Sequence, residues 1–333
     1  MLVPGMDPAA LAEGAKRLAA GELVAFPTET VYGLGARADD DAAVAKIFAA
    51  KGRPSDHPLI VHVLEEADAV LFARELPPVA RKLMQAFWPG PLTVIVPRAP
   101  GRGAAAAGGQ DSIGLRCPAH PVARALLQAA RAQGVLGVAA PSANRFGRVS
   151  PTHAAHVVSE FEPGLLVLDG GDCEVGIESS IVDCSRGQPV LLRPGVITRA
   201  QIEAAAGETL GQLDAAAPRA SGTLEAHYAP AATVRLLTLP VLRDALAQTP
   251  QQGLESVAVY SRTLSPRAGS LDRPMPDDAI AAAHELFAVL RALDDAGVRQ
   301  IWIEAPEQDP AWDGVRDRLT RAAAATPGAL VWR

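Results

Sequence analysis

The sequence predicts an α/β protein with a twisted, mixed open sheet, flanking helices and a second, smaller α/β domain. Short apolar runs alternate with segments of helical periodicity through residues 1–206. The last strand candidates of this region follow one another without long helices between them, which favours a mixed sheet over a purely parallel one. After a stretch rich in Gly, Ala, Pro and Ser, a second alternating series begins.

In the first region, apolar residues at intervals of three and four predict helices, and short apolar or alternating runs predict strands. The predicted helices span residues 8–20, 40–50, a segment that ends before Trp88, 121–132 and 152–161. The predicted strands span residues 23–26, 59–63, 92–96, 112–116, 136–140, 165–168, 180–183 and 190–192.

Residues 207–231 show neither helical periodicity nor the apolar or alternating runs of a strand, and they predict an irregular linker between two domains. The first domain is therefore expected over residues 1–206 and a small, Rossmann-like α/β domain over residues 232–333. The predicted strands of the second domain span residues 234–237, 256–260, 301–304 and 330–332, and its predicted helices span residues 241–247, 277–296 and 312–325.

Composition excludes several classes of protein. Of the 333 residues, 49% are hydrophobic and 20% are charged, and no apolar run approaches the roughly 18 residues of a membrane span. The first residues lack a basic cluster followed by an apolar core, so we expect no secretory signal and a cytoplasmic location. Cys117, Cys173 and Cys184 lack the spacing of zinc or redox motifs and are expected to be small buried hydrophobes.

Charge is unevenly distributed along the chain. The net charge of −6 argues against a protein that binds nucleic acid over its whole surface. Residues 74–148, however, contain ten Lys or Arg and two acids, a local charge of +8. From Gln201 onward, 12 Arg stand against 17 acids, which disfavours tRNA contact by the second domain. The basic segment suits an anionic ligand, although exposed arginines that balance acids elsewhere would give the same count.

Two motifs follow early elements of the first domain. FPTETVYGLG, residues 26–35, supplies polar side chains and two glycines that permit close backbone approach. KGRPSDHPL, residues 51–59, places three basic side chains in one Pro-restrained loop, an arrangement that suits a triphosphate: Lys51, Arg53 and His57. A plain strand-to-helix turn and a solvated helix end are the alternative interpretations. His62 is either a core histidine or part of the same cleft.

Further polar side chains follow later strands. SIGLRCP places Ser112 and Arg116 on one strand face, because side chains four apart in a strand point the same way. PSANRFGRVSPT, residues 141–152, crowds hydroxyls, an amide and two arginines into one loop. GIESSIVD and LLRPG add Ser180 and Arg193 near strand ends. The Ala- and Gly-rich residues 101–110 are expected to form a flexible loop and not a phosphate cradle.

The candidate functional side chains in these motifs are mainly hydroxyls and arginines, with one loop lysine. This inventory contains no Ser-His-Asp arrangement, nucleophile elbow or metal-ligand spacing. Such an inventory suits nucleotidyl transfer, in which the protein positions the reactants and neutralises phosphates while a divalent ion helps.

Taken in order, these motifs, with PGPLTVIV and with HYAP at residues 227–230, resemble the longer, two-domain branch of the YrdC-type threonylcarbamoyl-AMP synthase family. The resemblance implies a YrdC-like twisted sheet with a positively charged cleft. It also implies a nucleotidyltransferase that makes threonylcarbamoyl-AMP and pyrophosphate from L-threonine, bicarbonate and ATP. A separate transferase complex would then modify the adenosine next to the anticodon of tRNAs that read ANN codons.

The resemblance also implies roles for individual residues. L-threonine would lie near Thr30, His62, Arg116, the backbone of Ala140, and Ser180. ATP would meet Lys51, Arg53, His57, Ser112, Ser142, Asn144, Ser150, Arg193 and Tyr228, the last from a linker that closes over the nucleotide. Lys51 and Arg53 would act on the reacting phosphates, and Mg²⁺ would be held mainly by ATP without a protein metal site. The chain departs from the family pattern at His57, at Phe146 and at Ser221-Gly222.

Two other functions remain as alternatives. A protein of the same fold could bind double-stranded RNA or tRNA without catalysis. A carbamoyl-transferring enzyme of the hydrogenase-maturation type is disfavoured, because such chains are longer and carry cysteine-rich zinc modules. The sequence leaves open the role of the second domain, the oligomeric state, the general base, the order of substrate binding and direct tRNA contact.

Overall fold

The structure, a computed structural model, describes residues 1–325 and 330–331. The chain divides into two compact units. Unit 1 comprises Met1–Phe146 and Ser150–Thr223, and unit 2 comprises Gly147–Val149 and the chain from Leu224 onward. The break after Thr223 falls inside the predicted linker, so the first part of that linker packs with unit 1.

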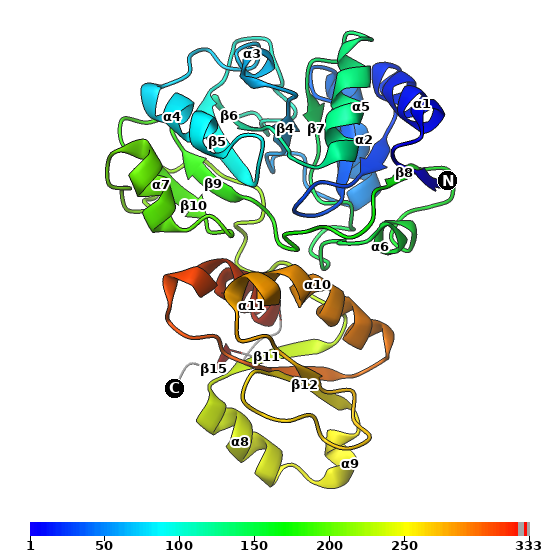
Figure 1. The fold of residues 1–333 in the computed structure, drawn as a ribbon, viewed down its shortest axis with the longest axis vertical. Helices are drawn as coiled ribbons and strands as arrows, with labels where there is room; N and C mark the ends of the chain where they lie inside the picture. Colours follow the sequence, from blue (N-terminus) through cyan, green and yellow to red (C-terminus); the bar gives the residue numbers. More distant parts are fainter. Residues whose placement is uncertain (326–329, 332–333) are drawn as a thin grey trace. The chain divides into compact units, whose positions relative to one another are not determined.

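Unit 1 is built on one mixed ten-stranded sheet (Figure 1) with the strand order β1-β8-β2-β3-β7-β4-β6-β5-β9-β10. Its strands are β1 (Leu2–Pro4), β2 (Val24–Phe26), β3 (Gly33–Arg37), β4 (Ile60–His62), β5 (Leu92–Pro97), β6 (Ser112–Arg116), β7 (Val138–Ala139), β8 (Leu166–Asp169), β9 (Ser180–Asp183) and β10 (Val190–Arg193). Its helices are α1 (Pro8–Ala19), α2 (Asp41–Lys51), α3 (Glu66–Ala69), α4 (Pro78–Phe87), α5 (Pro121–Arg131), α6 (Ala154–Val158) and α7 (Arg199–Ala206).

Capping fixes the ends of the helix that carries the loop lysine. The Asp40 side chain accepts hydrogen bonds from the N–H groups of Ala42 and Ala43 and so begins α2. Gly52 ends it in the left-handed region, at φ 63°, which glycine adopts without strain. Lys51 is therefore the last helical residue, and its side chain is fixed at the start of the following loop.

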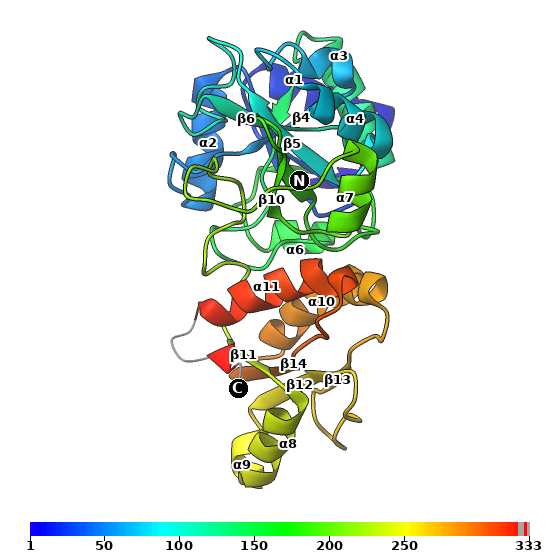
Figure 2. The same ribbon diagram turned by 90° about the vertical axis from the view of Figure 1, so that its left-hand side faces the viewer.

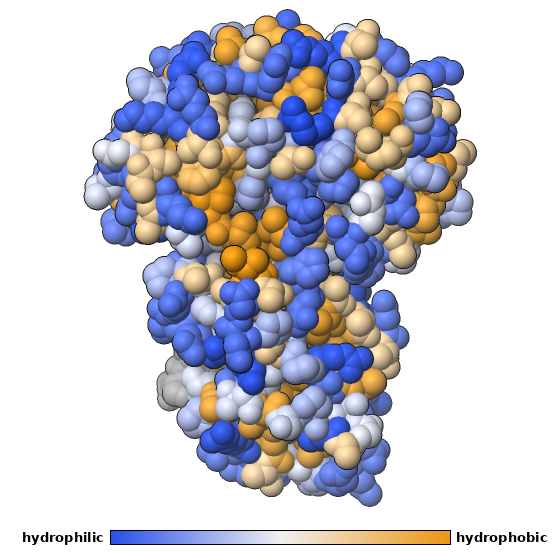
Figure 3. Space-filling model, viewed as in Figure 1, coloured by the Kyte–Doolittle hydropathy of each residue, from blue (hydrophilic) through white to orange (hydrophobic). Residues whose placement is uncertain are grey.

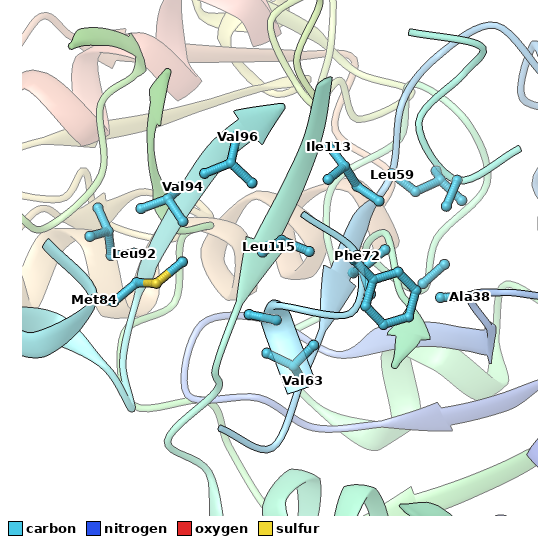
Figure 4. Packing of buried hydrophobic residues seen from close by; sticks show 14 of the residues in the cluster. Ala38, Leu59, Val63, Phe72, Met84, Leu92, Val94, Val96, Ile113 and Leu115 are labelled. Carbon is cyan, nitrogen blue, oxygen red and sulfur yellow. The ribbon is translucent and has the colours of Figure 1, made fainter. Parts of the chain in front are cut away.

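Apolar side chains pack on both faces of this sheet. Alternate residues of β5 and β6, among them Val94, Val96 and Leu115, face the larger core together with Phe72 and Met84 (Figure 4). On the opposite face, α1 and α5 pack over β2 and β8 in a second cluster. A third cluster has Ile60, Ile95 and Ile181 at its centre, and the linker residues Ala217 and Ala220 pack against it. The linker thus covers part of the sheet face that also carries polar side chains.

Unit 2 is an open parallel sheet with helices on both faces. Figure 2 shows α8 and α9 on one face of this sheet and α10 and α11 on the other. The strand order is β13-β12-β14-β11-β15. Its elements are β11 (Thr233–Leu237), α8 (Leu239–Gln248), α9 (Gln251–Leu254), β12 (Val257–Ser261), β13 (Arg273–Pro274), α10 (Ala279–Asp295), β14 (Gln300–Glu304), the 3₁₀ helix η1 (Pro310–Trp312), α11 (Asp313–Ala324) and β15 (Leu330–Val331). The prediction of a small α/β domain is confirmed; the last residue of its predicted final strand, 332, lies outside the described residues.

The predicted mixed α/β fold is confirmed, but some elements were missed. β3 lies in the GLGAR segment, where the sequence predicted no strand, because two glycines weaken its strand pattern. Hydrogen bonding to β2 on one side and β7 on the other stabilises the strand conformation despite the low strand propensity of glycine. In the loop of residues 101–110, Ala106 and Ala107 are fully buried, and the Ala106 carbonyl accepts a hydrogen bond from Leu59 N at 2.7 Å. This loop is therefore packed against the chain that enters β4.

The surface drawn in Figure 3 mixes hydrophilic residues with smaller hydrophobic patches. Within residues 1–325 and 330–331, each helix is too short or too polar to cross a membrane. The three cysteines are buried and unpaired with one another, as the sequence predicted. Burial raises the pKa of each thiol, so these cysteines are poor nucleophiles.

Candidate functional site

Polar side chains from several strands share one face of the unit 1 sheet. Register places His62 of β4 beside Arg116 of β6, and Ile60 beside Gly114. Because side chains alternate along a strand, Ser112, Gly114 and Arg116 point to this same face, with about 13 Å between the first and the last. Gly114 has no side chain, and a Cβ there would lie 3.4 Å from Thr93 and 3.8 Å from Ile60 and Ile95, so these three side chains flank the face between Ser112 and Arg116.

Arg116 is held by three separate hydrogen bonds. Its Nη1 donates to Thr30 Oγ1 at 2.9 Å, and its Nη2 donates to Glu29 Oε1 at 2.6 Å. The third bond joins Nε to the Gly90 carbonyl at 3.3 Å. The Arg116 and Glu29 side chains are 4% and 6% exposed, which makes this a buried ion pair. Thr30 is fully buried and also contacts the Thr28 hydroxyl at 2.8 Å.

His62 lies next to this ion pair as a neutral imidazole. Burial, reinforced by the nearby positive charge of Arg116, lowers the pKa of His62 to about 3. Its Nδ1 has no hydrogen-bond partner among the described residues. The ring meets Phe26 edge-on, with centroids 6.3 Å apart. His62 therefore brings a polar nitrogen, but no charge, to the neighbourhood of Arg116.

The depressed pKa of His62 predicts acid destabilisation. Below about pH 6.5 the unfolded chain binds a proton at His62 that the folded protein does not bind until about pH 3. The free energy of unfolding should therefore fall by about 1.4 kcal/mol per pH unit as the pH drops through this window. Urea titrations at pH 7 and pH 5 should show about 2 kcal/mol more loss in the wild type than in His62→Phe. Equal losses in the two proteins would contradict this assignment.

The two remaining residues of the predicted threonine group lie at strand ends. Ala140 directly follows β7, and its N–H donates to the Ile60 carbonyl at 3.0 Å. Ser180 begins β9, and its hydroxyl donates to the Ile197 carbonyl at 2.9 Å. The structure therefore connects Thr30, His62 and Arg116 directly by contact or register, and it connects Ala140 and Ser180 to neighbouring strands.

Among the residues predicted to meet ATP, Lys51 is 3% exposed. Its Nζ donates to the Ser142 carbonyl at 2.6 Å and also to the Asn144 carbonyl. The Lys51 carbonyl in turn accepts from Phe146 N at 2.8 Å. Burial, aided by Arg53, lowers the pKa of Lys51 well below its usual value. Two distant segments, the end of α2 and residues 142–146, are thus fixed to one another around the Lys51 amino group.

Arg53, His57 and Phe146 form a second contact group. The Arg53 guanidinium lies 5.8 Å from the centre of the Phe146 ring, and Arg53 Nη2 donates to the Pro58 carbonyl at 2.9 Å. The His57 ring meets Phe146 edge-on at 5.5 Å. Burial, then the charge of Arg53, lowers the pKa of His57. Phe146 and His57, two departures from the family pattern, therefore contact one another.

Two further predicted residues are held by partners from the segment that precedes β9 and from the linker. Ser150 is fully buried, and its hydroxyl donates to Glu178 Oε1 at 2.5 Å. Arg193 is 2% exposed; its Nε and Nη2 donate to the Ser179 carbonyl, at 3.1 and 2.9 Å. Its Nη1 donates to the Ser221 carbonyl of the linker at 2.8 Å. Arg193 thus ties the linker to the sheet.

A small cavity opens between the linker and the sheet face near Ser112. Strand residues and linker residues line it together, namely Pro58, Leu59, Ile60, Thr93, Ile95, Gln110, Ser112, Gly114, Ile181, Arg219, Ala220 and Ser221. Arg219 is fixed there by an ion pair with Asp56 at 2.8 Å, and its backbone N–H donates to Gln110 Oε1 at 2.8 Å. The linker therefore covers the Ser112 end of the site.

Tyr228 belongs to unit 2, where it is 1% exposed. Its ring is tilted by 30° over Phe287, with centroids 5.4 Å apart, and Arg318 lies 5.5 Å from its centre. Its φ of 60° is the one positive value at a non-glycine position among the described residues. The structure thus places Tyr228 among the buried side chains of unit 2, on Phe287 and beside Arg318.

The side chains that could ligate a metal ion do not cluster in the described part of the chain. Within the described ranges, no three His, Cys, Asp or Glu side chains are grouped so that they could hold a metal ion.

The sequence did not indicate the two carboxylates that hold predicted site residues. Glu29 counted only as one polar residue of the FPTETVYGLG motif, and Glu178 was not used. An acidic residue within two positions of a predicted polar site residue is a signal that could have pointed to both carboxylates. Which side chain each carboxylate pairs with depends on the tertiary fold.

Comparison with known proteins gives two family matches. Residues 16–195 match the Sua5, YciO and YrdC family, whose description is telomere recombination. Residues 197–324 match the family described as the C-terminal domain of threonylcarbamoyl-AMP synthase. The two matches meet at residue 196, between β10 and α7, so the second includes the linker.

Relatives match along nearly the whole chain. The threonylcarbamoyl-AMP synthase of Pyrococcus abyssi is 37% identical over 321 residues, with 91% of each chain covered. That of Bacillus subtilis is 38% identical over 328 residues, covering 94% of this chain and 92% of the relative. The crystal structure of P. abyssi Sua5 complexed with L-threonine superposes with a TM-score of 0.86 at 36% identity, covering 96% of this chain and 95% of the other.

Proposed function

Because the chain belongs to the Sua5/YrdC family of threonylcarbamoyl-AMP synthases, we propose that it joins L-threonine, bicarbonate and ATP into threonylcarbamoyl-AMP and releases pyrophosphate. The observation that supports this most strongly is a pair of buried basic side chains in unit 1: Arg116, held beside Glu29 on the sheet, and Lys51, held at the end of α2 by the Ser142 carbonyl. An amino-acid carboxylate and a triphosphate would be held there as separate anions.

The proposed threonine end uses Arg116 as its anchor. Three of the five guanidinium N–H donors are occupied by Thr30, Glu29 and Gly90, which leaves two for the substrate carboxylate. His62, with its neutral ring, is proposed to contact the same substrate, as are the Ala140 backbone and Ser180. The relative solved with L-threonine supports the assignment of this amino acid.

The proposed ATP end uses Lys51, Arg53 and Arg193 to offset phosphate charge. His57, Ser112, Ser142, Asn144 and Ser150 are proposed as further contacts of the nucleotide. The charge of the triphosphate would favour the ammonium form of Lys51, whose pKa burial lowers. We propose that Mg²⁺ enters with ATP, bound mainly by phosphate oxygens, because the described residues offer no cluster of acids for it.

The reaction is proposed to proceed in two bond-forming steps. The neutral threonine amine attacks the carbon of bicarbonate or CO₂ and forms the carbamate; with bicarbonate the hydroxyl leaves with an amine proton as water, and with CO₂ the amine proton passes to solvent. A carbamate oxygen then attacks the α-phosphorus of ATP in line, and the bond to pyrophosphate breaks. The protein contributes proximity and charge neutralisation through Arg116 and Lys51, and the linker over Ser112 limits access of water to the carbamate. Tyr228 is proposed to join this cover when the nucleotide binds.

The product is proposed to serve tRNA modification. A separate transferase complex would pass the threonylcarbamoyl group to the adenosine beside the anticodon in tRNAs that read ANN codons, so direct tRNA contact is not required of this chain. We place the reaction in the cytoplasm, where ATP, bicarbonate and tRNA meet. RNA binding without catalysis, the other function considered, is not favoured, because the relatives are named as synthases.

The proposal is tested by pyrophosphate release from ATP in the presence of Mg²⁺ and bicarbonate. Release should depend on L-threonine and be much slower with L-serine, glycine or no amino acid. Release that ignores the amino acid, by a protein whose circular dichroism shows it folded, would contradict the proposed function. Salt-dependent RNA binding by that protein would then support the RNA-binding alternative.

A further inference from the structure

The Glu29 carboxylate is an integral part of the Arg116 anchor. Its Oε1 accepts from Arg116 Nη2 at 2.6 Å, and its Oε2 accepts from the Ala119 N–H at 3.0 Å. Its backbone carbonyl accepts from Val175 N at 2.7 Å. With both carboxylate oxygens and the backbone held, Glu29 is fixed beside the guanidinium and is only 5% exposed.

The buried groups around this pair add no net charge. Burial alone would raise the pKa of Glu29, but the charge and hydrogen bond of Arg116 hold that pKa below its ordinary value. Burial also lowers the pKa of His62 and His120 and raises that of Cys173, so these neighbours are neutral. One positive and one negative charge therefore remain, and the anchor is neutral before any substrate arrives.

A neutral buried anchor discriminates between ligands by their charge. A zwitterionic amino acid brings no net charge, whereas an acid without an amine brings a net negative charge beside the Glu29 carboxylate. Burying an uncompensated charge is costly, and like charges in a low dielectric repel strongly. Arg116 without Glu29 would have the opposite preference, because a lone guanidinium is neutralised by a simple carboxylate.

We propose that Glu29 is a specificity-determining residue, which with Arg116 forms a neutral anchor that admits zwitterionic amino acids and rejects the corresponding acids that lack the amine. This inference rests on the proposed function, because it takes the Arg116 end as the threonine site. Glu29 itself is a positioning and charge-balancing group, and it is not assigned a proton-transfer step.

The test compares two ligands in two proteins by isothermal titration calorimetry. L-Threonine and 3-hydroxybutanoate share the carboxylate and hydroxyl and differ in the amine. The wild type should prefer threonine by a factor of about 100 or more. In Glu29→Gln the affinity for threonine should fall at least about tenfold while that for 3-hydroxybutanoate rises, so that the preference nearly vanishes. An equal loss of affinity for both ligands would overturn the proposal and leave Glu29 a merely structural support.

Two further variants serve as controls for Glu29→Gln. Glu29→Asp keeps the charge and should retain the preference despite weaker binding; if Glu29→Gln does not fold, loss of the preference in Glu29→Asp overturns the proposal. Asp68→Asn removes another buried carboxylate, one that pairs with Arg131 at 3.3 Å, and should leave the preference unchanged. Threonine-dependent pyrophosphate release by the wild type is measured first. Its absence overturns the proposed function, whereas its presence with an unaltered preference in Glu29→Gln overturns this inference alone.

Discussion

Arg116→Met is expected to abolish threonine-dependent pyrophosphate release and to lower the free energy of unfolding by about 3–5 kcal/mol. The substitution removes the proposed anchor for the substrate carboxylate. It also leaves the buried Glu29 carboxylate without the guanidinium that donates to it at 2.6 Å, which accounts for the loss of stability. Urea unfolding and the pyrophosphate assay measure the two effects separately.

A double variant separates the two roles of Arg116. In Arg116→Met/Glu29→Gln no unpaired buried charge remains, so most of the lost stability should return while threonine-dependent turnover stays absent. Arg116→Lys keeps the charge but has fewer fixed donors, and it should retain stability better than activity. If the stable double variant turned over threonine at the wild-type rate, Arg116 would not be the anchor.

Lys51→Met is the second substitution with a large expected effect. Turnover should fall by a factor of about 10²–10³, because the lysine that we propose faces the reacting phosphates is lost. Two carbonyls, those of Ser142 and Asn144, also lose their shared donor, so the free energy of unfolding should fall by about 1–3 kcal/mol. The pyrophosphate assay at saturating threonine, with ATP varied, measures the loss.

The same helix supplies the control for Lys51. Lys46 also lies in α2, and its Nζ donates to the Gly21 carbonyl at 2.6 Å, so Lys46→Met removes a lysine–carbonyl hydrogen bond from the same helix, at an exposed position. Its turnover should remain close to that of the wild type. Equal turnover of Lys51→Met and Lys46→Met would show that the position of Lys51 at the end of α2 has no catalytic importance.

The fold could be predicted from the sequence wherever periodicity was strong. The predicted strand of residues 112–116 matches β6, and the predicted helix of residues 121–132 differs from α5 by one residue. β3 was missed because Gly33 and Gly35 weaken its pattern, and its strand conformation depends on pairing with neighbours far away in the chain. Close packing also requires these glycines: a Cβ on Gly35 would lie 2.7 Å from Phe26.

For the site, the sequence could indicate residue types but not their partners. Lys51 and the loop of residues 142–144 were both singled out, and the structure joins them through hydrogen bonds across 91 and 93 residues. The ion pair of Arg116 with Glu29 spans 87 residues, so no local pattern could indicate it. The assignment of Tyr228 to unit 2 likewise follows from its packing on Phe287, which lies 59 positions later.

Mass spectrometry with ¹³C-labelled bicarbonate tests the central claim most directly. The purified protein is incubated with L-threonine, ATP, Mg²⁺ and either labelled or unlabelled bicarbonate, and the nucleotide products are analysed at once. The account predicts threonylcarbamoyl-AMP that gains one mass unit from the label, is missing when Arg116→Met replaces the wild type and is strongly reduced when Lys51→Met does. AMP and pyrophosphate without any threonine- and bicarbonate-derived adduct would contradict it.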